Sequence, residues 1–357
     1  MEENKQHKTA LPETEPIPSA QAPEALLDIR GLRVEYHTDE DVVYAVNGLD
    51  LTIGKGESLG LVGETGAGKT TTALSVRRLI ADPPGKIMGG EIWFEGEDML
   101  QAKPARLREI RGSKISVIFQ DPMTSLNPVY SVGDQIAEVI HQHEKCSKEE
   151  GRRKAGDMLE MVGIPRARYD EYPHQFSGGM KQRVVIAMSI ACSPELILAD
   201  EPTTALDVTI QAQVLELMNE LKEKLRTSLL LITHDLGVVA QVCDRVAIMY
   251  AGEIVESGTI AEVFDHPHHP YTIGLFGSIP SLDETAEKLK PIQGQMPDPT
   301  ELPEGCAFAP RCPYATGACR TRKPEMTGVG GTQMVRCLAH QGVFESPKLM
   351  EEVRHGR

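Results

Sequence analysis

Residues 63–70 read Gly-Glu-Thr-Gly-Ala-Gly-Lys-Thr and fit the template Gly-x-x-x-x-Gly-Lys-Thr of a phosphate-binding loop. The loop follows an apolar run, Ser58–Val62, that predicts a buried strand, and it precedes residues 70–80, whose pattern predicts a helix. In such a unit the glycines allow backbone N–H groups and the helix N-terminus to face a phosphate. A chance glycine turn is the alternative, and the flanking strand and helix count against it.

The loop also carries side chains suited to a nucleotide. Lys69 is expected to reach the β- and γ-phosphates, and the Thr70 hydroxyl is expected to ligate Mg²⁺. The residues that we expect to contact the ligand here are Gly63, Glu64, Thr65, Gly66, Ala67, Gly68, Lys69, Thr70 and Thr71.

A second apolar run, residues 196–199, ends at the acidic pair Asp200 and Glu201. Carboxylates suit Mg²⁺, so we expect Asp200 to hold the ion through water. Glu201 is the better candidate to orient or deprotonate an attacking water. Solvated carboxylates at a strand end are the alternative, which the phosphate-binding loop makes weaker.

Two more polar residues follow predicted strands. Gln120 comes after the apolar run 115–119, and its amide could touch Mg²⁺ or the water. His234 comes after the run 229–233, where an imidazole could contact the γ-phosphate. Either residue could instead be an ordinary polar group, but ligands bind at the carboxyl edge of such sheets.

Ser177 and the two glycines after it, Gly178 and Gly179, open a predicted helix upstream of the acidic strand. A serine followed by two small residues at a helix start forms a surface on which a phosphate can lie. The sequence therefore contains two separate phosphate-binding elements.

Apolar strands and helices alternate along the chain, which predicts an α/β core with a mostly parallel sheet. Before the loop, residues 27–29 and 32–36 alternate as strands, and residues 42–53 are expected to form a strand pair. Residues 130–190 look like an inserted helical section, with 148–162 as its clearest amphipathic helix. Residues 246–250 and 253–256 predict a closing hairpin.

Bulk properties restrict the function classes. The chain has 357 residues, of which 40% are hydrophobic and 25% charged, as in globular proteins. Its net charge of −15 argues against nucleic acid as a partner and against adsorption to anionic lipid. No apolar run approaches the ~20 residues of a membrane span, and the proline-bearing residues 1–25 predict a disordered leader. We expect a cytoplasmic protein with reduced thiols.

The order of these motifs resembles the ATP-binding subunits of ABC transporters over residues 27–260. That family implies a P-loop ATPase core with an antiparallel β subdomain and an inserted helical subdomain. It also implies a head-to-tail dimer, in which ATP binds the Lys69 loop of one subunit and residues 177–179 of the other. Asp207 then lies in the D-loop, and an aromatic residue stacks on adenine, for which Tyr36 is preferred and Tyr44 is the alternative.

Phe176 and Met180 depart from the usual family motif and resemble one branch, the ATPases of oligopeptide, dipeptide and nickel importers. The resemblance implies an ATPase that powers peptide import at the cytoplasmic face of the membrane. The implied partners are a second ATPase subunit, preferably a paralogue, two transmembrane permease subunits and an extracytoplasmic substrate-binding protein. A non-transport ABC ATPase of translation or DNA repair, or an importer of nickel or another small solute, is the alternative.

Near Phe264 the composition shifts to His, Pro, Gly and Cys and the periodicity fades, which predicts a domain boundary around residue 260. We therefore expect a leader (1–25), an ATP-binding domain (26–260), a small irregular C-terminal extension (261–345) and a tail (346–357). The extension contains Cys306, Cys312, Cys319 and Cys337 in a loop-rich setting. Four thiolates suit either tetrahedral zinc or a [4Fe–4S] cluster, although the spacing lacks the close cysteine pair of a zinc finger. The resemblance favours the iron–sulfur cluster.

Overall fold

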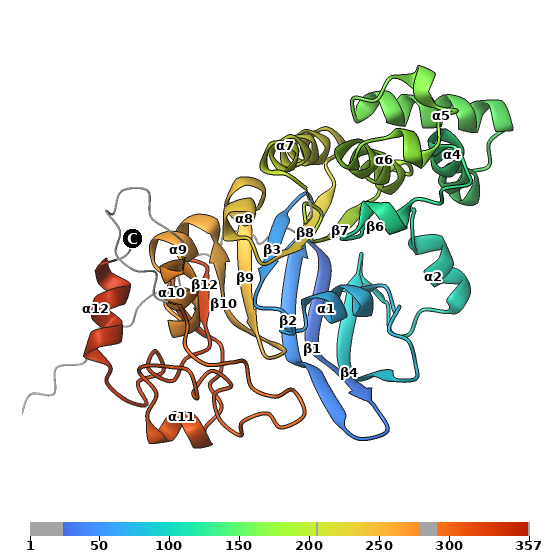
Figure 1. Ribbon diagram of the computed structural model, residues 1–357. Coiled ribbons are helices and arrows are strands. Elements are labelled where there is room, and N and C mark those ends of the chain that lie inside the picture. The colour runs from blue at the N-terminus through green and yellow to red at the C-terminus, as the bar shows by residue number, and fades with distance from the viewer. Residues whose placement is uncertain (1–23, 205, 279–290, 356–357) are drawn as a thin grey trace, which may run out of the picture.

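The computed structural model describes residues 24–204, 206–278 and 291–355 (Figure 1). The leader expected over residues 1–25 lies outside these residues as far as residue 23. Within the described ranges, none of the helices combines the length and apolar character that crossing a bilayer requires.

The strands are β1 (Ala25–His37), β2 (Val42–Gly54), β3 (Ser58–Val62), β4 (Gly85–Phe94), β5 (Glu97–Asp98), β6 (Ile115–Ile118), β7 (Leu196–Asp200), β8 (Ser228–Thr233), β9 (Arg245–Tyr250), β10 (Glu253–Thr259), β11 (Thr327–Gly330) and β12 (Gln333–Val335). The α-helices are α1 (Lys69–Val76), α2 (Pro104–Ile110), α3 (Pro122–Ser125), α4 (Val132–His143), α5 (Lys148–Met161), α6 (Gly178–Ile190), α7 (Val208–Leu225), α8 (Leu236–Val242), α9 (Ile260–Asp265), α10 (Pro270–Gly277), α11 (Gly317–Thr321) and α12 (Pro347–His355).

The main sheet has the strand order β11-β12-β10-β9-β3-β8-β7-β6. The strands β6, β7, β8, β3 and β9 run parallel, whereas β10, β12 and β11 pair antiparallel. Both faces are buried, because Leu196 and Leu198 of β7 enter one core cluster while Ile197 and Ala199 enter the other. The mostly parallel α/β core is therefore confirmed.

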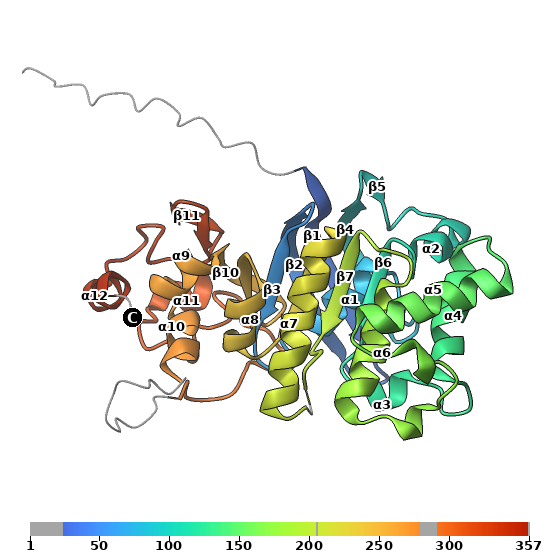
Figure 2. The same cartoon turned by 90° about the horizontal axis from the view of Figure 1, so that it is seen from above.

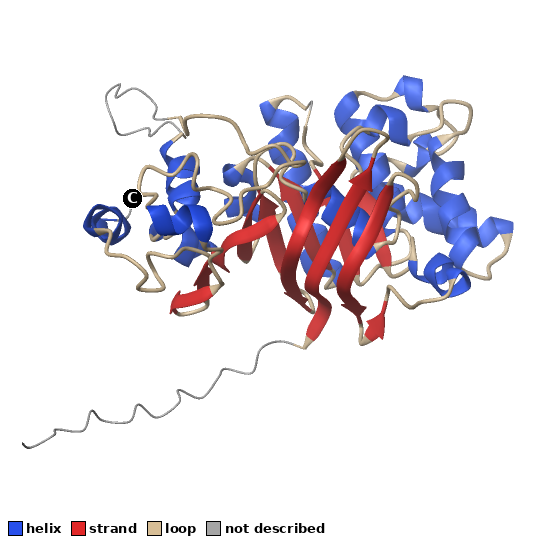
Figure 3. Ribbon diagram, turned by 90° about the horizontal axis from the view of Figure 1, so that it is seen from below, coloured by secondary structure: helices blue, strands red, loops and turns tan. Residues whose placement is uncertain are grey.

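A second, antiparallel sheet has the order β2-β1-β4-β5. The expected strand pair at residues 42–53 is wrong, because β2 is one strand that pairs with β1 along its length. Gly48, at a φ of 84°, is bypassed where Leu32 pairs with Leu49 and Arg33 with Asn47. A bulge thus takes the place of a turn. In Figure 3 the strands occupy the middle of the molecule, with helices on either side.

The helices divide between the two faces of the main sheet. Helix α1 packs between the two sheets, where Ala73 and Val76 join the core that also contains β1, β2 and β4. It is shorter than predicted, because Arg78 adopts a left-handed φ of 49° just after its end. Helices α4 to α8 contribute to the core on the opposite face. The predicted helix at 148–162 is confirmed as α5.

The C-terminal extension is continuous with the main sheet. Strand β12 pairs with β10, and β11 pairs with β12. Helices α9 to α12 lie at one end of the molecule, and α4 to α6 lie at the opposite end (Figures 1 and 2). Tyr271 of α10 and Phe308 join the core cluster that fills one face of the sheet. The extension therefore packs directly on the structure that carries the phosphate-binding loop.

Candidate functional site: a nucleotide site at the carboxyl edge of the sheet

Four of the residues predicted from strand ends lie at one edge of the main sheet. Strands β3, β8, β7 and β6 are parallel neighbours, so their carboxyl ends share that edge. Lys69, Glu201, His234 and Gln120 follow them in the chain.

The loop between β3 and α1 has the backbone that its glycines predict. A Cβ at Gly63 would lie 2.2 Å from the Met249 carbonyl oxygen, and one at Gly68, whose φ is 102°, would lie 2.3 Å from that of Ala45. No larger residue fits either position without moving backbone. Thr65 and Gly66 are exposed at the tip of the loop, whereas Ala67 is buried.

The Lys69 ammonium lies within its own loop. Its Nζ donates to the backbone oxygens of Gly63 at 2.7 Å and Glu64 at 3.0 Å. Burial lowers the pKa of Lys69, an effect that the nearby carboxylates of Glu201 and Asp200 oppose. The charge is therefore held where a polyphosphate would take over from the carbonyl oxygens.

Thr70 and Asp200 come together as the sequence suggests for a magnesium site. Burial raises the pKa of Asp200, and the nearby Thr70 hydroxyl opposes this effect. Hydroxyl and carboxylate oxygens beside Lys69 are the hard donors that Mg²⁺ takes beside a nucleotide. The donor set fits the ion.

Glu201 is the centre of a hydrogen-bond network. Its carboxylate accepts from Gln120 Nε2 at 2.9 Å and from Thr204 Oγ1 at 2.9 Å, and His234 Nδ1 lies 3.1 Å away. The Glu201 side chain is 19% exposed, whereas that of His234 is 63% exposed. The Glu201 backbone has a φ of 48°, and the Glu201 N–H donates to the Ile232 carbonyl oxygen at 2.8 Å. The carboxylate is thereby fixed at the sheet edge, with solvent access.

The two aromatic candidates occupy different surroundings. The Tyr36 hydroxyl lies 3.3 Å from Thr71 Oγ1, so its ring lies beside the first turn of α1. Tyr44 is 38% exposed, and its N–H donates to the Pro299 carbonyl oxygen at 2.9 Å.

The second phosphate-binding element opens α6. Ser177 is the N-cap, with its hydroxyl accepting from Met180 N–H, and both Ser177 and Gly178 are exposed. Gly179 is buried, since a Cβ there would lie 2.5 Å from Ile210 Cγ2 of α7. Asp207 caps α7 by accepting from the Ile210 N–H at 3.0 Å. Because α6 and α1 pack on opposite faces of the main sheet, the two phosphate-binding elements belong to different layers.

The four cysteines of the extension line one small cavity, whose other walls include Phe308, Leu338, Phe344 and Leu349. The backbone N–H of Ala309 donates to the Cys306 carbonyl oxygen at 3.0 Å, and that of His340 donates to the Cys337 carbonyl oxygen at 3.2 Å. Burial raises the pKa of Cys306 to about 11 and of Cys312 to about 12. Among the described residues, no group of three or more His, Cys, Asp or Glu side chains is arranged to hold a metal ion.

Sequence reasoning missed the contacts that the extension makes with the phosphate-binding loop. Arg311 pairs with the Glu64 carboxylate, and the Tyr271 hydroxyl accepts from the Glu64 N–H at 3.0 Å. Met296 Cε lies 3.6 Å from where a Cβ on Gly66 would be. Glu64 and Arg311 are 247 residues apart, so no local pattern could indicate their pairing.

Comparison with known proteins places this site in a family. A model described as ABC transporter matches residues 46–204, and one described as oligopeptide/dipeptide transporter, C-terminal region, matches residues 255–319. The oligopeptide transport ATP-binding protein AppD of Bacillus subtilis (strain 168) is 49% identical over 88% of this chain and 97% of its own. The chain belongs to the ABC transporter family. It is an ABC-type ATPase of the transport branch, as the resemblance implied.

Further relatives agree. The dipeptide transport ATP-binding protein DppD of Bacillus subtilis (strain 168) is 48% identical over 88% of this chain and 94% of its own. Among solved structures, the ATP-binding cassette MJ0796, in a dimeric post-hydrolysis state bound to ADP and Pi, matches with a TM-score of 0.58. It is 28% identical and covers 66% of this chain and 98% of its own. The ABC-type fold is confirmed.

Proposed function

We propose that this chain hydrolyses ATP to power the import of di- or oligopeptides through separate permease subunits. The observation that carries the proposal is the meeting of Lys69, Asp200 and Glu201 at one sheet edge, in a chain whose relatives are named for oligopeptide and dipeptide transport. The specific solute is proposed by likeness to those relatives.

The site suggests a division of roles. Lys69 would move from the carbonyl oxygens of its loop to the β- and γ-phosphates, and Thr70 and Asp200 would hold Mg²⁺, which would neutralise charge on the phosphates. Glu201 accepts the proton of the attacking water, and His234 contacts the γ-phosphate. Gln120 donates its amide N–H to Glu201, so its carbonyl oxygen is the atom suited to Mg²⁺ or the water. Gln120 lies at the start of the loop that follows β6, so its contacts would couple that loop to the presence of the γ-phosphate.

We infer further that the site is completed by a second ATPase subunit. Ser177 and Gly178 are exposed at the start of α6, in a different layer from Lys69 of the same chain. A head-to-tail dimer, with a paralogue as the preferred partner, brings these residues to the other subunit's ATP, with Asp207 close to the interface. The dimer works beneath two permease subunits at the cytoplasmic face of the membrane, with an extracytoplasmic binding protein supplying the solute.

Peptide uptake tests the transport proposal. Cells that depend on this chain should lose uptake of labelled di- or oligopeptides with Lys69→Ala, because the phosphates lose their cation. Lys86→Ala, at an exposed lysine of β4, is the matched control and should keep uptake. Full peptide uptake with Lys69→Ala contradicts the proposal, and loss of nickel uptake alone would assign the nickel alternative.

The cysteine cavity supports a second proposal, that it holds a [4Fe–4S] cluster. Four thiols line one cavity whose other walls include apolar side chains, and four cysteine thiolates are the usual ligands of such a cluster. Tetrahedral zinc is the alternative, although the spacing of the four cysteines lacks the close pair of a zinc finger. When bound, the cluster would supply covalent cross-links between Cys306, Cys312, Cys319 and Cys337.

Metal analysis of anaerobically purified protein tests the cluster. It should contain about four iron and about four acid-labile sulfide per chain, with the iron lost on Cys312→Ser. Cys146→Ser, at a cysteine outside the cavity, is the control and should retain the iron. Zinc alone, or no metal, contradicts the assignment.

A further inference from the structure

Glu64, the second residue of the phosphate-binding loop, is held by the C-terminal extension at both backbone and side chain. Its N–H donates to the Tyr271 hydroxyl at 3.0 Å. Its carboxylate accepts from Arg311 Nη1, which lies 3.0 Å from Oε1 and 3.1 Å from Oε2. In this way two residues distant in the chain fix the start of the loop.

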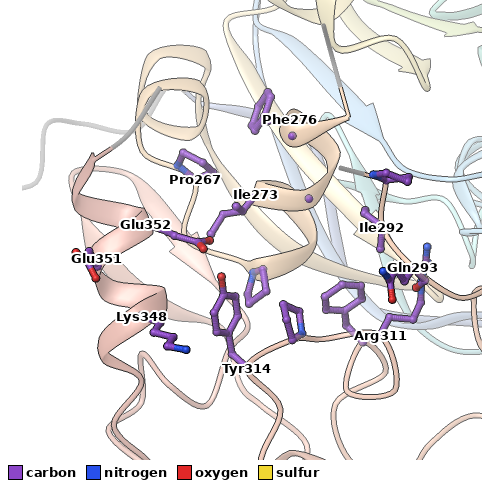
Figure 4. Close-up of a pocket in the computed structure, with 16 residues that line it drawn as sticks. Pro267, Ile273, Phe276, Ile292, Gln293, Arg311, Tyr314, Lys348, Glu351 and Glu352 are labelled. Atoms are coloured by element: carbon purple, nitrogen blue, oxygen red, sulfur yellow. The ribbon is translucent and has the colours of Figure 1, made fainter. Parts of the chain in front are cut away.

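Arg311 is itself rigidly placed. Its side chain is 6% exposed, and its Nε donates to the Gln293 carbonyl oxygen at 3.1 Å. Its guanidinium carbon lies 5.8 Å from the Tyr250 ring centre and 5.9 Å from that of Phe308. Figure 4 shows Arg311 beside Gln293, on the side of an approximately 1050 Å³ cavity away from Lys348 and Glu351 of α12.

Glu64 joins the ion pair to Lys69, the lysine of the phosphate-binding loop. Lys69 Nζ donates to the backbone oxygen of Glu64 at 3.0 Å, so the N–H and the carbonyl group of Glu64 are both hydrogen-bonded. A shift of Glu64 moves the surroundings of the Lys69 ammonium and the backbone N–H groups that face the phosphates. A buried guanidinium without its carboxylate is strongly disfavoured, which keeps Glu64 in place.

We propose that Arg311 is a positioning residue for nucleotide binding, which acts through Glu64 to hold the phosphate-binding loop in its receiving conformation. The inference rests on the ATPase assignment and is independent of the transported solute and of whether the cysteine cavity binds a metal. Arg311 touches neither ATP nor water in this role. It therefore affects nucleotide affinity rather than the chemical step.

The same turn carries Cys312. The N–H groups of Arg311 and Cys312 both donate to the Phe308 carbonyl oxygen at 3.0 Å. The experiment must therefore separate an effect of the ion pair from an effect on the cysteines, which requires the metal content of each variant.

The test is a double-mutant cycle on the full-length chain, with equilibrium binding of ADP as the readout. Arg311→Met and Glu64→Gln should each raise the Kd for ADP about tenfold, or about 1.4 kcal/mol. The double variant should be no weaker than either single one, because both remove one interaction. Arg311→Lys keeps the positive charge but does not reproduce both contacts with the Glu64 carboxylate. Its Kd for ADP should lie between those of the unmodified chain and Arg311→Met. Arg322→Met, at an exposed arginine of the extension, is the control and should leave the Kd unchanged.

ATP turnover and metal content complete the experiment. The purified complex with Arg311→Met should show a raised KM with kcat within about twofold of the unmodified complex, and its metal content should not change. An unchanged Kd in Arg311→Met and Glu64→Gln overturns the proposal. Additive effects on the Kd in the double variant also overturn it, as does a loss of metal that accompanies the loss of ADP affinity. If Arg311→Met does not fold, Glu64→Gln decides, since the Glu64 side chain is 32% exposed.

Discussion

Glu201 is fixed by more groups than its position in the sequence indicates. Gln120, Thr204 and His234 surround its carboxylate, and its φ of 48° is one that a non-glycine residue adopts at a cost of about 1–3 kcal/mol. This backbone turns the side chain away from the line of β7, toward the ends of β6 and β8. The strained backbone thus determines the direction of the Glu201 carboxylate.

The adenine contact gives a prediction at the same scale. Because the Tyr36 hydroxyl contacts Thr71 at the start of α1, we expect its ring to stack on the base, and Tyr36→Ala should weaken ATP binding by about 1–3 kcal/mol. Equilibrium ATP binding without Mg²⁺ measures it. Tyr44→Ala should leave the affinity near that of the unmodified chain, and the reverse order of the two variants would identify Tyr44 as the stacking residue.

Single residues were predictable wherever they end a buried strand. Parallel pairing brings the ends of four apolar runs to one edge of the main sheet. The residues that follow these runs in the chain are Lys69, Gln120, Asp200, Glu201 and His234. Arg311 was not predictable, because an ion pair between residues 247 positions apart depends on how the extension packs.

At the scale of elements, helix α6 presents its N-terminus to solvent while its body packs on the main sheet. Gly179 lies against Ile210 of α7, so the start of α6 and the cap of α7 at Asp207 form one rigid corner. Such a corner can offer Ser177 and Gly178 to another subunit without being remodelled.

Ser177→Arg tests that corner. The chain should keep its own ATP binding, because Lys69 lies in another layer, while hydrolysis by the assembled complex should fall by at least about tenfold. Ser147→Arg is a matched control, since Ser147 is the N-cap of α5 and loses the same kind of cap, worth about 1 kcal/mol. The ATPase rate of the complex is the measurement, and equal rates for both variants would remove α6 from the site.

Elements with a clear pattern were predicted well: the buried strands β3, β7 and β8 and the amphipathic helix α5 are where their patterns indicate. Errors arose where local geometry decides. Gly48 makes a bulge instead of a turn in β2, and the left-handed Arg78 ends α1 early. Neither is visible in hydrophobic periodicity, because both depend on a single φ angle.

For the whole molecule, the main feature is that the extension completes the sheet that carries the ATP site. Strand β12 lengthens the sheet beyond β10, and the aromatic rings of Tyr250, Tyr271 and Phe308 pack together behind the phosphate-binding loop. The composition change near residue 260 indicated a separate small unit but could not reveal this shared packing. The extension therefore contacts the phosphate-binding loop and also forms the cysteine cavity.

The most direct measurement of the account is ATP turnover and ATP binding by the purified complex with Glu201→Gln. The amide keeps the size of the side chain but cannot accept the proton, so turnover should fall by about 10²- to 10⁴-fold while ATP binding is retained. Glu195→Gln, at an exposed glutamate before the same strand, should leave both unchanged. Turnover in Glu201→Gln above about a tenth of the unmodified rate would contradict the assignment of Glu201 as the base.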